Sequence, residues 1–239
     1  MKSLQEEVLK LQLRKMELKV AEESRSTFLT FVKKVWPEFI AGSHHKIIAK
    51  KFEDVSRGKI KRIIINMPPR HTKSEFASHL FPAWMLGNNP RLKIIQTTHT
   101  AELSDTFGRK VRNLFAQDEF KEVFPKVSLS EDSKAAGRFN TNMGGEYFGA
   151  GVGGAITGRG ADLLIIDDPH SEQDALYPSK LNKAYEWYTS GPRQRLQPGG
   201  TIVVVMTRWS EIDLTGRLLE AQTDPKADQW EVVEFPAVL

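Results

Sequence analysis

Residues 62–74 read Arg-Ile-Ile-Ile-Asn-Met-Pro-Pro-Arg-His-Thr-Lys-Ser, and this stretch decides the fold. Its first five residues form a short apolar run rich in β-branched side chains, which is typical of a buried parallel strand. After Ser74 the pattern becomes helical and stays so to residue 86. Because backbone N–H groups at a helix N-terminus suit phosphate oxygens, this order of strand, loop and helix predicts a phosphate-binding loop.

The loop differs from the regular Gly-x4-Gly-Lys-Ser/Thr motif at both glycines. Met67 and Thr72 occupy the glycine positions, whereas Lys73 and Ser74 match by type. In such loops the lysine neutralises the β- and γ-phosphates and the hydroxyl coordinates Mg²⁺. On the loop alone, the alternative is a basic turn in which Ser74 is an ordinary helix N-cap.

The residues between the two glycine positions change the character of the loop. Pro68 and Pro69 can stiffen a turn that glycine usually makes. Arg70 and His71 place further positive charge beside the lysine. We therefore expect a stiff, basic loop.

Apolar runs and helical stretches alternate along the rest of the chain. Further strands are predicted at residues 92–96, 163–166, 201–206 and 232–236. Helices are predicted at residues 74–86, 100–116 and 179–190. Residues 139–148 read instead as a β-hairpin around Asn142-Met143-Gly144-Gly145. Strands that alternate with helices indicate an α/β fold with a mostly parallel sheet covered on both faces.

Three helices are predicted before the first strand. Residues 1–24 carry apolar side chains at helical spacing in a narrow stripe, which indicates a peripheral helix packed on the domain or on a partner. A solvated helical arm is the alternative. A second helix at residues 26–35 ends before Trp36-Pro37, and a third follows Gly42-Ser43.

A second apolar strand ends in two carboxylates, in the run Asp-Leu-Leu-Ile-Ile-Asp-Asp-Pro-His at residues 162–170. Ligands of open α/β folds bind at the carboxyl edge of the sheet, where this strand ends. Asp167 is placed to hold a Mg²⁺ shell. Asp168 stands where related ATPases carry a catalytic Glu, one methylene longer. The alternatives are a helix N-cap with a turn, and a metal-dependent nuclease, which needs more converging carboxylates.

Residues 149–160 are dense in glycine, which leaves Arg159 with few local constraints on its direction. One interpretation is that Arg159 reaches the γ-phosphate of a nucleotide on a neighbouring subunit, as arginine fingers do. The alternative is a structural arginine that pairs with Asp162 or with a strand-end carbonyl. On composition alone the structural alternative is favoured.

Thr207 and Arg208 directly follow the predicted strand at residues 201–206. They therefore belong to the same carboxyl edge as Lys73 and Asp167. In motor ATPases a polar pair at this position senses the γ-phosphate. A helix N-cap at Ser210 is a compatible alternative, because it uses other residues.

The composition of the 239-residue chain is that of a globular protein, with 40% hydrophobic and 27% charged residues. There is no cysteine, which excludes disulfides and thiolate metal sites. The net charge of +4 permits a polyanionic partner without requiring one. No apolar run approaches the length of a membrane span, and the N-terminus lacks a secretory pattern, so we expect a soluble intracellular protein.

Several motifs in order resemble the large terminase subunit of tailed bacteriophages. They are Pro-Pro-Arg-His-Thr-Lys-Ser-Glu (68–75), Gly-Arg-Gly-Ala-Asp-Leu-Leu-Ile-Ile-Asp-Asp-Pro (158–169), Thr-Arg-Trp-Ser-Glu-Ile-Asp-Leu-Thr-Gly (207–216), Gly-Ser-His-His (42–45) and Gly-Asn-Asn-Pro (87–90). The resemblance covers residues 36–239 and implies a P-loop NTPase fold of the RecA-like (ASCE) class. It implies an N-terminal helical, lid-like arm at residues 1–40 and an ATPase domain at residues 41–239. The nuclease domain usual in the family has no counterpart in this chain.

The resemblance also implies roles for individual residues. The nucleotide-binding set is Pro69, Arg70, His71, Thr72, Lys73, Ser74, Glu75 and His45. The catalytic set is Asp168, Arg159, Lys73 and Arg70, the metal set is Ser74 and Asp167, and the coupling pair is Thr207 and Arg208. Arg159 occupies the position of the trans-acting arginine finger of the family, which reverses the preference from composition. His44-His45 stand where a glutamine-type adenine contact is expected.

The function implied by the resemblance is an ATP-driven motor that moves double-stranded DNA into a procapsid, with ATP and Mg²⁺ as ligands. Its partners are DNA, held through backbone phosphates, the portal protein and the small terminase subunit. A homo-oligomeric ring is expected in the assembled state, and a monomer is the alternative for the isolated chain. The expected location is the host cytoplasm. The alternatives are a helicase-like nucleic-acid-dependent ATPase and a non-catalytic module that binds DNA or portal protein through a degenerate P-loop.

Overall fold

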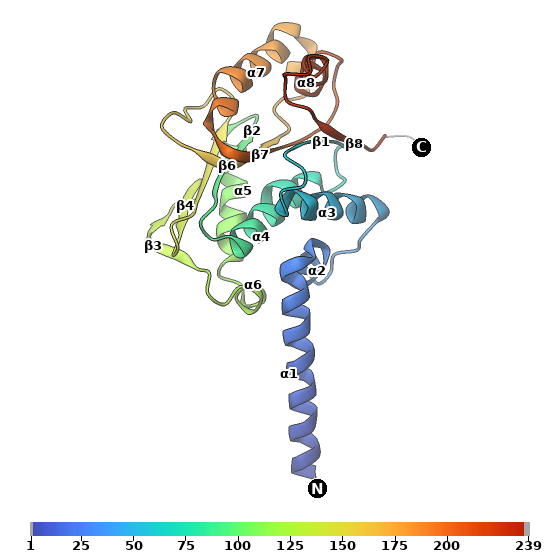
Figure 1. Cartoon of the computed structure of the whole chain (residues 1–239), viewed down its shortest axis with the longest axis vertical. Coiled ribbons are helices and arrows are strands. Elements are labelled where there is room, and N and C mark those ends of the chain that lie inside the picture. The colour runs from blue at the N-terminus through green and yellow to red at the C-terminus, as the bar shows by residue number, and fades with distance from the viewer. Residues whose placement is uncertain (1, 237–239) are drawn as a thin grey trace.

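The computed structural model describes residues 2–236, in which eight strands form one sheet with helices on both faces (Figure 1). The strand order is β3-β4-β5-β2-β6-β7-β1-β8. The strands are β1 (Arg62–Asn66), β2 (Lys93–Thr98), β3 (Leu129–Lys134), β4 (Arg138–Thr141), β5 (Glu146–Gly151), β6 (Ala161–Asp167), β7 (Leu196–Met206) and β8 (Glu231–Glu234). Neighbours from β5 to β8 in this order are parallel, which confirms the predicted α/β fold with a mostly parallel sheet.

The helices lie between the strands as the sequence pattern predicted, with one unexpected division. They are α1 (Lys2–Ser26), α2 (Phe28–Val35), α3 (Ser43–Ser56), the π-helix η1 (Glu75–Leu80), α4 (Phe81–Asn88), α5 (Ala101–Leu114), α6 (Asp118–Val123), α7 (Pro178–Ser190) and α8 (Leu214–Ala221), with short 3-10 turns at Asp174–Leu176 and Pro192–Arg195. The single helix predicted at 74–86 is a π-helix that continues into an α-helix. Pro82 has no N–H to donate to the carbonyl of Ser78, and the wide turn before it accommodates the ring.

The predicted hairpin is confirmed, and it carries an additional strand. β4 and β5 pair antiparallel with Phe139 opposite Tyr147, and the two rings stack with centroids 4.8 Å apart. Gly144 takes a positive φ of 88° in the turn. The edge strand β3 and helix α6 were not predicted, since β3 reads Leu-Ser-Glu-Asp-Ser-Lys and has no apolar run.

Two hydrophobic cores lie on opposite faces of the sheet because strand side chains alternate between them. Ile63 and Ile65 of β1 belong to the core that contains α2, α3, η1, α4, α5 and α6. Ile64 belongs to the core that contains α7 and α8. Strands buried on both faces must be apolar at every position, which explains the continuous Ile, Val and Leu runs.

Helix α1 projects from the domain as an arm (Figure 1). Every side chain from Leu4 to Val20 is exposed, so packing of this stretch on its own domain is a wrong prediction. Packing on a partner and the solvated arm both stay predictions. The helix joins the domain at its C-terminal end, where Ala21 and Ser24 are buried and Trp84 Nε1 donates to the Ser24 carbonyl at 2.8 Å. Within the predicted arm of residues 1–40, the stretch 28–39 contributes side chains to the main core.

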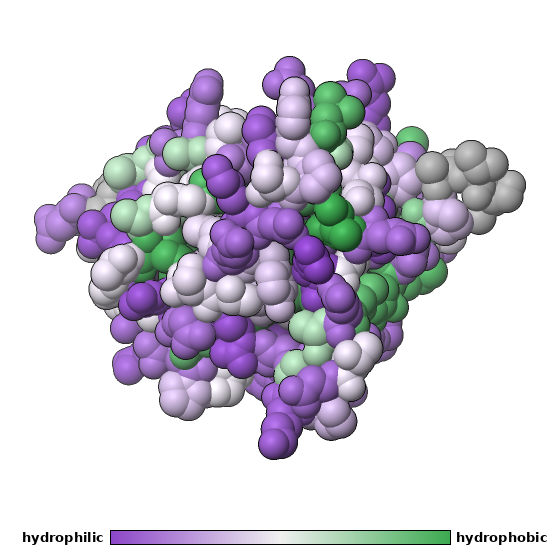
Figure 2. All heavy atoms as spheres, turned by 90° about the horizontal axis from the view of Figure 1, so that it is seen from above, coloured by the Kyte–Doolittle hydropathy of each residue, from purple (hydrophilic) through white to green (hydrophobic). Residues whose placement is uncertain are grey.

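The surface at the end opposite α1 is mostly hydrophilic, with hydrophobic side chains scattered among polar ones (Figure 2). Among the helices of residues 2–236, none combines the length and the apolar character that crossing a membrane requires.

Candidate functional site

The phosphate loop and the acidic residues meet at the carboxyl edge of the sheet. β7 lies between β6 and β1, so the loop after β1, the Asp pair ending β6 and Thr207 after β7 come from three adjacent strands. Neighbouring strands are roughly 4.8 Å apart, which places the ends of β1 and β6 about 10 Å apart. Side chains of ordinary length span that gap.

The backbone of the loop is left-handed at two residues that are not glycine. Arg70 has φ 63° and Thr72 has φ 62°. Thr72 occupies the second glycine position of the regular motif, and a β-branched residue in this region is strained. The loop therefore keeps a glycine-like conformation although it lacks the glycine. The Thr72 carbonyl accepts from the Phe76 N–H at 3.0 Å, which joins the loop to the helix that follows.

Lys73 is buried and forms an ion pair with Asp168, with Nζ 2.8 Å from Oδ2. The other oxygen of Asp168, Oδ1, accepts from the backbone N–H of Thr207 at 2.8 Å. Asp168 also has a left-handed backbone, with φ 41°. Its carboxylate therefore connects the phosphate loop to the end of β7, and its side chain is 26% exposed, whereas Asp167 is buried.

Asp167 is fully enclosed and accepts two serine hydroxyls. Ser74 Oγ donates to Oδ1 at 3.0 Å and Ser78 Oγ donates to Oδ2 at 2.7 Å. Burial, followed by the charge of the neighbouring Asp168, raises the pKa of Asp167 to about 7, against the hydrogen bonds and Lys73, which lower it. A cation near this carboxylate would relieve the repulsion between the two aspartates.

The residues present fit a Mg²⁺ ion held together with a nucleotide. Mg²⁺ in phosphate sites takes one or two carboxylates and completes its shell with phosphate oxygens and water. The Ser74 hydroxyl and Asp167 Oδ1 lie side by side and supply such a partial set. Within residues 2–236 no cluster of three or more His, Cys, Asp or Glu side chains could hold a metal, so this ion would depend on the nucleotide.

His45, which the resemblance placed in the nucleotide-binding set, lies against the phosphate loop. Its Nδ1 accepts from the Gly42 N–H at 2.9 Å, and its Nε2 is 2.5 Å from Thr72 Oγ1. Burial, helped by the nearby His44 and His71, lowers the pKa of His45 to about 4. The ring is therefore neutral at pH 7, and its Nε2–H donates to the threonine.

The remaining predicted nucleotide ligands divide into exposed and engaged groups. Pro69, Arg70 and His71 are exposed on the loop, and His71 Nδ1 is 2.8 Å from the Pro69 carbonyl. Glu75 instead contacts His79 and Lys110. Burial opposes ionisation of Glu75, but hydrogen bonds from these two residues prevail and lower its pKa to about 2. In this arrangement Glu75 ties the start of η1 to α5.

Arg159 lies at the opposite edge of the sheet from Lys73. It precedes β6, whose seven residues from Ala161 to Asp167 span about 20 Å at roughly 3.3 Å per residue. Arg159 pairs with Glu146 and lies over the Phe148 ring at 3.9 Å from its centroid. Both structural partners named from the sequence are wrong, since Asp162 instead accepts from the Lys93 N–H at 2.8 Å. Arg159 cannot reach the phosphate loop of its own chain.

The coupling pair separates into two environments. The Thr207 hydroxyl is 3.4 Å from the Met67 carbonyl, so Thr207 contacts both the loop and Asp168. Arg208 turns away, and its Nε donates to Asp213 Oδ2 at 3.0 Å. Asp213 caps α8 by accepting from the Gly216 N–H at 2.9 Å, so the N-cap predicted at Ser210 is wrong. A capping carboxylate three residues later accepts the backbone N–H groups of Trp209 and Ser210 as well.

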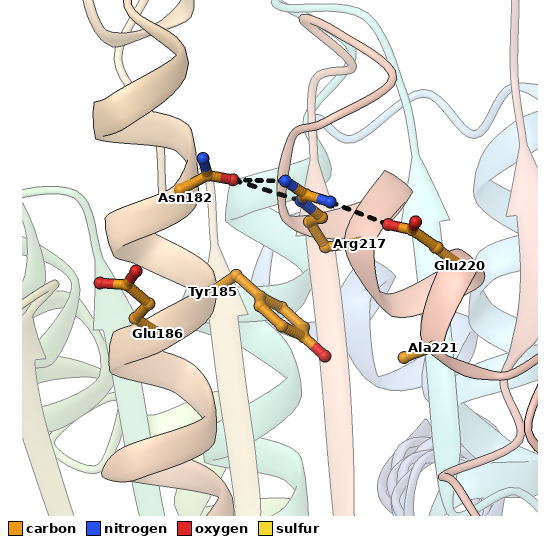
Figure 3. Close-up of a pocket in the computed structure, with 6 residues that line it drawn as sticks. All are labelled: Asn182, Tyr185, Glu186, Arg217, Glu220 and Ala221. Carbon is orange, nitrogen blue, oxygen red and sulfur yellow. Dashed lines mark hydrogen bonds and ion pairs between the residues drawn. The ribbon is translucent and has the colours of Figure 1, made fainter.

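Two of the pockets in the described part of the chain bear on the position of the site. One of about 180 Å³ adjoins the phosphate loop and is lined by Asn66, Met67, Pro68, Pro69, Thr207, Arg208, Glu234, Phe235 and Pro236. A larger one of about 430 Å³ lies between α7 and α8, where Arg217 is held by Asn182 and Glu220 (Figure 3). Its lining includes no residue of the phosphate loop, whereas Met67, Pro68 and Pro69 of that loop line the smaller pocket.

Sequence reasoning missed three buried polar residues behind Asp167. They are Ser78, Gln96 and Ser104, each fully buried. For Gln96 a signal existed in the run Gln96-Thr97-Thr98, because three buried polar residues follow Ile94-Ile95 at the end of the strand.

No protein-family model matches the chain, and no curated protein matches it. Solved structures do. The crystal structure of the HK97 bacteriophage large terminase aligns with a TM-score of 0.55 at 14% identity, over 84% of this chain and 41% of that one. The large terminase of a thermophilic bacteriophage aligns in its ADP complex (TM-score 0.46, 12% identity, 78% and 44% covered) and in its ATP-gamma-S complex (0.47, 11%, 86% and 43%).

The chain spans 41–44% of the length of these proteins. The alignment with the HK97 protein shows that the chain has the fold of part of a large terminase, which confirms the resemblance inferred from the motifs at the level of the fold.

Proposed function

We propose that this chain is the ATP-hydrolysing motor domain of a bacteriophage large terminase and that it uses hydrolysis to translocate double-stranded DNA. The observation that carries the proposal is the convergence of Lys73, Ser74, Asp167 and Asp168 at the carboxyl ends of β1 and β6. The shared fold with the HK97 large terminase supports the same assignment.

Phosphoryl transfer needs positioning and charge stabilisation more than covalent chemistry from the protein. Lys73 offers its ammonium group to the β- and γ-phosphates, which compete with Asp168 for it. Once released from Lys73, Asp168 can orient a water toward the γ-phosphorus, because its side chain, unlike that of Asp167, is open to solvent. A Mg²⁺ ion held by Ser74 and Asp167 would neutralise charge on the phosphates.

Thr207 is the residue that can transmit the state of the site. It contacts Asp168 through its N–H and Met67 through its hydroxyl, so it responds to movement of either. Arg208 and Asp213 then connect this position to the start of α8. We infer that loss of the γ-phosphate moves this segment, and that DNA is held through backbone phosphates without sequence preference.

Arg159 completes the site only from a neighbouring subunit. Its own loop is out of reach, and its side chain is 20% exposed beside Glu146. We infer that the Glu146 pair opens on assembly and that Arg159 then faces the γ-phosphate of the next subunit. Arginine fingers of this kind contribute about 10³–10⁵-fold to turnover.

The test is Mg²⁺-dependent ATPase activity of the full chain with and without double-stranded DNA. We expect Lys73→Ala and Asp168→Asn to lower turnover by roughly 10²–10³-fold, the usual loss when a charge-stabilising group or a group that acts on the attacking water is removed. Nucleotide binding without turnover at any protein concentration would support the non-catalytic module instead. Stimulation by single-stranded but not double-stranded nucleic acid would support the helicase-like alternative.

A further inference from the structure

A chain of buried hydrogen bonds runs from Asp167 across the sheet. Ser78 Oγ donates to Asp167 Oδ2 at 2.7 Å, and Gln96 Nε2 donates to Ser78 Oγ at 3.2 Å. The Gln96 Oε1 accepts from Ser104 Oγ at 2.7 Å and from the Tyr147 hydroxyl at 3.3 Å. The five residues come from β6, η1, β2, α5 and β5, and each is at most 1% exposed.

When Asp167 is ionised, the directions of these hydrogen bonds have one consistent arrangement. Ser78 has a single hydroxyl proton, which goes to the carboxylate, so its oxygen must accept from Gln96. Only the amide nitrogen of Gln96 can donate, which turns its oxygen toward the hydroxyls of Ser104 and Tyr147. Every donor therefore points toward Asp167, and such networks hold their members in one geometry when all are satisfied.

The helical turn that follows the phosphate loop explains how two serines reach one carboxylate. Ser74 and Ser78 are four residues apart and lie on the same side of the turn, so their hydroxyls meet the two oxygens of Asp167. Oδ2 is occupied by Ser78 in the interior. Oδ1 faces Ser74, and it is the oxygen left for a metal shell.

We propose that Ser78 and Gln96 are positioning residues that hold Asp167 so that Oδ1 faces the metal of the bound nucleotide. The inference rests on the proposed function, because it assigns these residues to the Mg²⁺ side of the same site. Mutating a group that hydrogen-bonds to a metal ligand typically lowers metal affinity or activity by 10–100-fold. Neither residue contacts the nucleotide, so nucleotide affinity without metal should be unchanged.

The experiment measures Mn²⁺ binding to the ADP complex of the full chain by electron paramagnetic resonance, with the affinity for a fluorescent ADP analogue in EDTA measured in parallel. We expect Ser78→Ala and Gln96→Met to weaken Mn²⁺ binding by roughly 10–100-fold. Both variants should bind the ADP analogue in EDTA within about twofold of the wild type, since the lost contacts belong to Asp167. Ser78→Thr keeps the hydroxyl and should restore most of the Mn²⁺ affinity.

Ser24→Ala is the matched control, because Ser24 is also fully buried and its hydroxyl donates to the Val20 carbonyl, far from the site. It should leave Mn²⁺ binding unchanged. If Ser78→Ala does not fold, Gln96→Met and Ser78→Thr still decide the question. Wild-type Mn²⁺ affinity in folded Ser78→Ala or Gln96→Met overturns the inference and leaves the proposed function standing. A wild-type chain that binds neither ADP nor Mn²⁺–ADP overturns the proposed function and the inference with it.

Discussion

Arg70 is the residue at which the strain of the phosphate loop can be separated from its chemistry. Its backbone is left-handed with φ 63°, and its exposed side chain forms no hydrogen bond or ion pair with another residue in the range 2–236. Arg70→Gly and Arg70→Ala therefore remove the same guanidinium and no other contact. Only glycine adopts this backbone conformation without a steric penalty.

The expected difference in stability follows from two opposing effects. A left-handed backbone destabilises an L-residue by about 1–2 kcal/mol and leaves glycine without this strain. Glycine has more conformational freedom in the unfolded chain, which offsets roughly 0.4–1 kcal/mol of the gain in stability. We expect Arg70→Gly to be more stable than Arg70→Ala by about 1 kcal/mol, or roughly 2–4 °C in Tm for a chain of this size.

The assay is thermal and urea unfolding of the nucleotide-free variants, followed by Mg²⁺-dependent ATPase activity. Both variants should lose turnover equally, by roughly 10–100-fold, the worth of one hydrogen bond to a charged group. Equal stability of the glycine and alanine variants would refute the left-handed loop. Wild-type turnover in Arg70→Gly would refute the catalytic role of Arg70.

Three further predictions address the finger, the buried histidine and the arm. Mixing Arg159→Ala with Lys73→Ala chains should restore part of the ATPase activity, because a mixed interface can pair an intact loop with an intact arginine; no rescue in a mixture shown to assemble would contradict a finger in trans. The free energy of unfolding of the wild type should fall as the pH drops from about 6.5 to about 4, because His45 is protonated in the unfolded chain at a higher pH than in the folded chain. Urea unfolding over a series of pH values should show a smaller fall for His45→Gln. Equal falls in the two proteins would contradict the buried neutral ring. Deleting residues 2–19 should shift Tm by less than about 1 °C, since their described side chains are exposed. Phe28→Ala, at a fully buried position, should lower the free energy of unfolding by about 3–5 kcal/mol. A large fall in Tm on deletion would show that the arm packs against the domain.

The strands, and the meeting of the loop at residues 67–74 with the two aspartates, could be predicted because their signals are local. A strand buried on both faces is apolar at each position, so β1 is visible as Arg-Ile-Ile-Ile-Asn without any knowledge of its neighbours. Parallel strands carry their ligands at one edge, so Lys73 and Asp167 could be assigned to one site before their distance was known. Edge strand β3 is polar and has no such signal.

The pairings of polar side chains could not be predicted, because they join residues that the sequence separates. Glu146 meets Arg159 only because the start of β5 and the start of β6 lie at the same end of the parallel strands. Gln96 meets Ser78 through the packing of η1 on β2, and Asp213 caps α8 three residues after the position that the local pattern favoured.

The sequence by itself determined the α/β class, the loop at residues 67–74 and the acidic end of β6, since apolar periodicity and motif order are properties of neighbouring residues. The tertiary structure alone decided that Arg159 faces away from its own loop, that Thr72 adopts a glycine-like backbone, and that Ser78 and Gln96 hold Asp167. The physical reason is that a buried polar group must find a partner wherever the fold brings one, and that partner is set by strand order and helix packing, which no local stretch of sequence encodes.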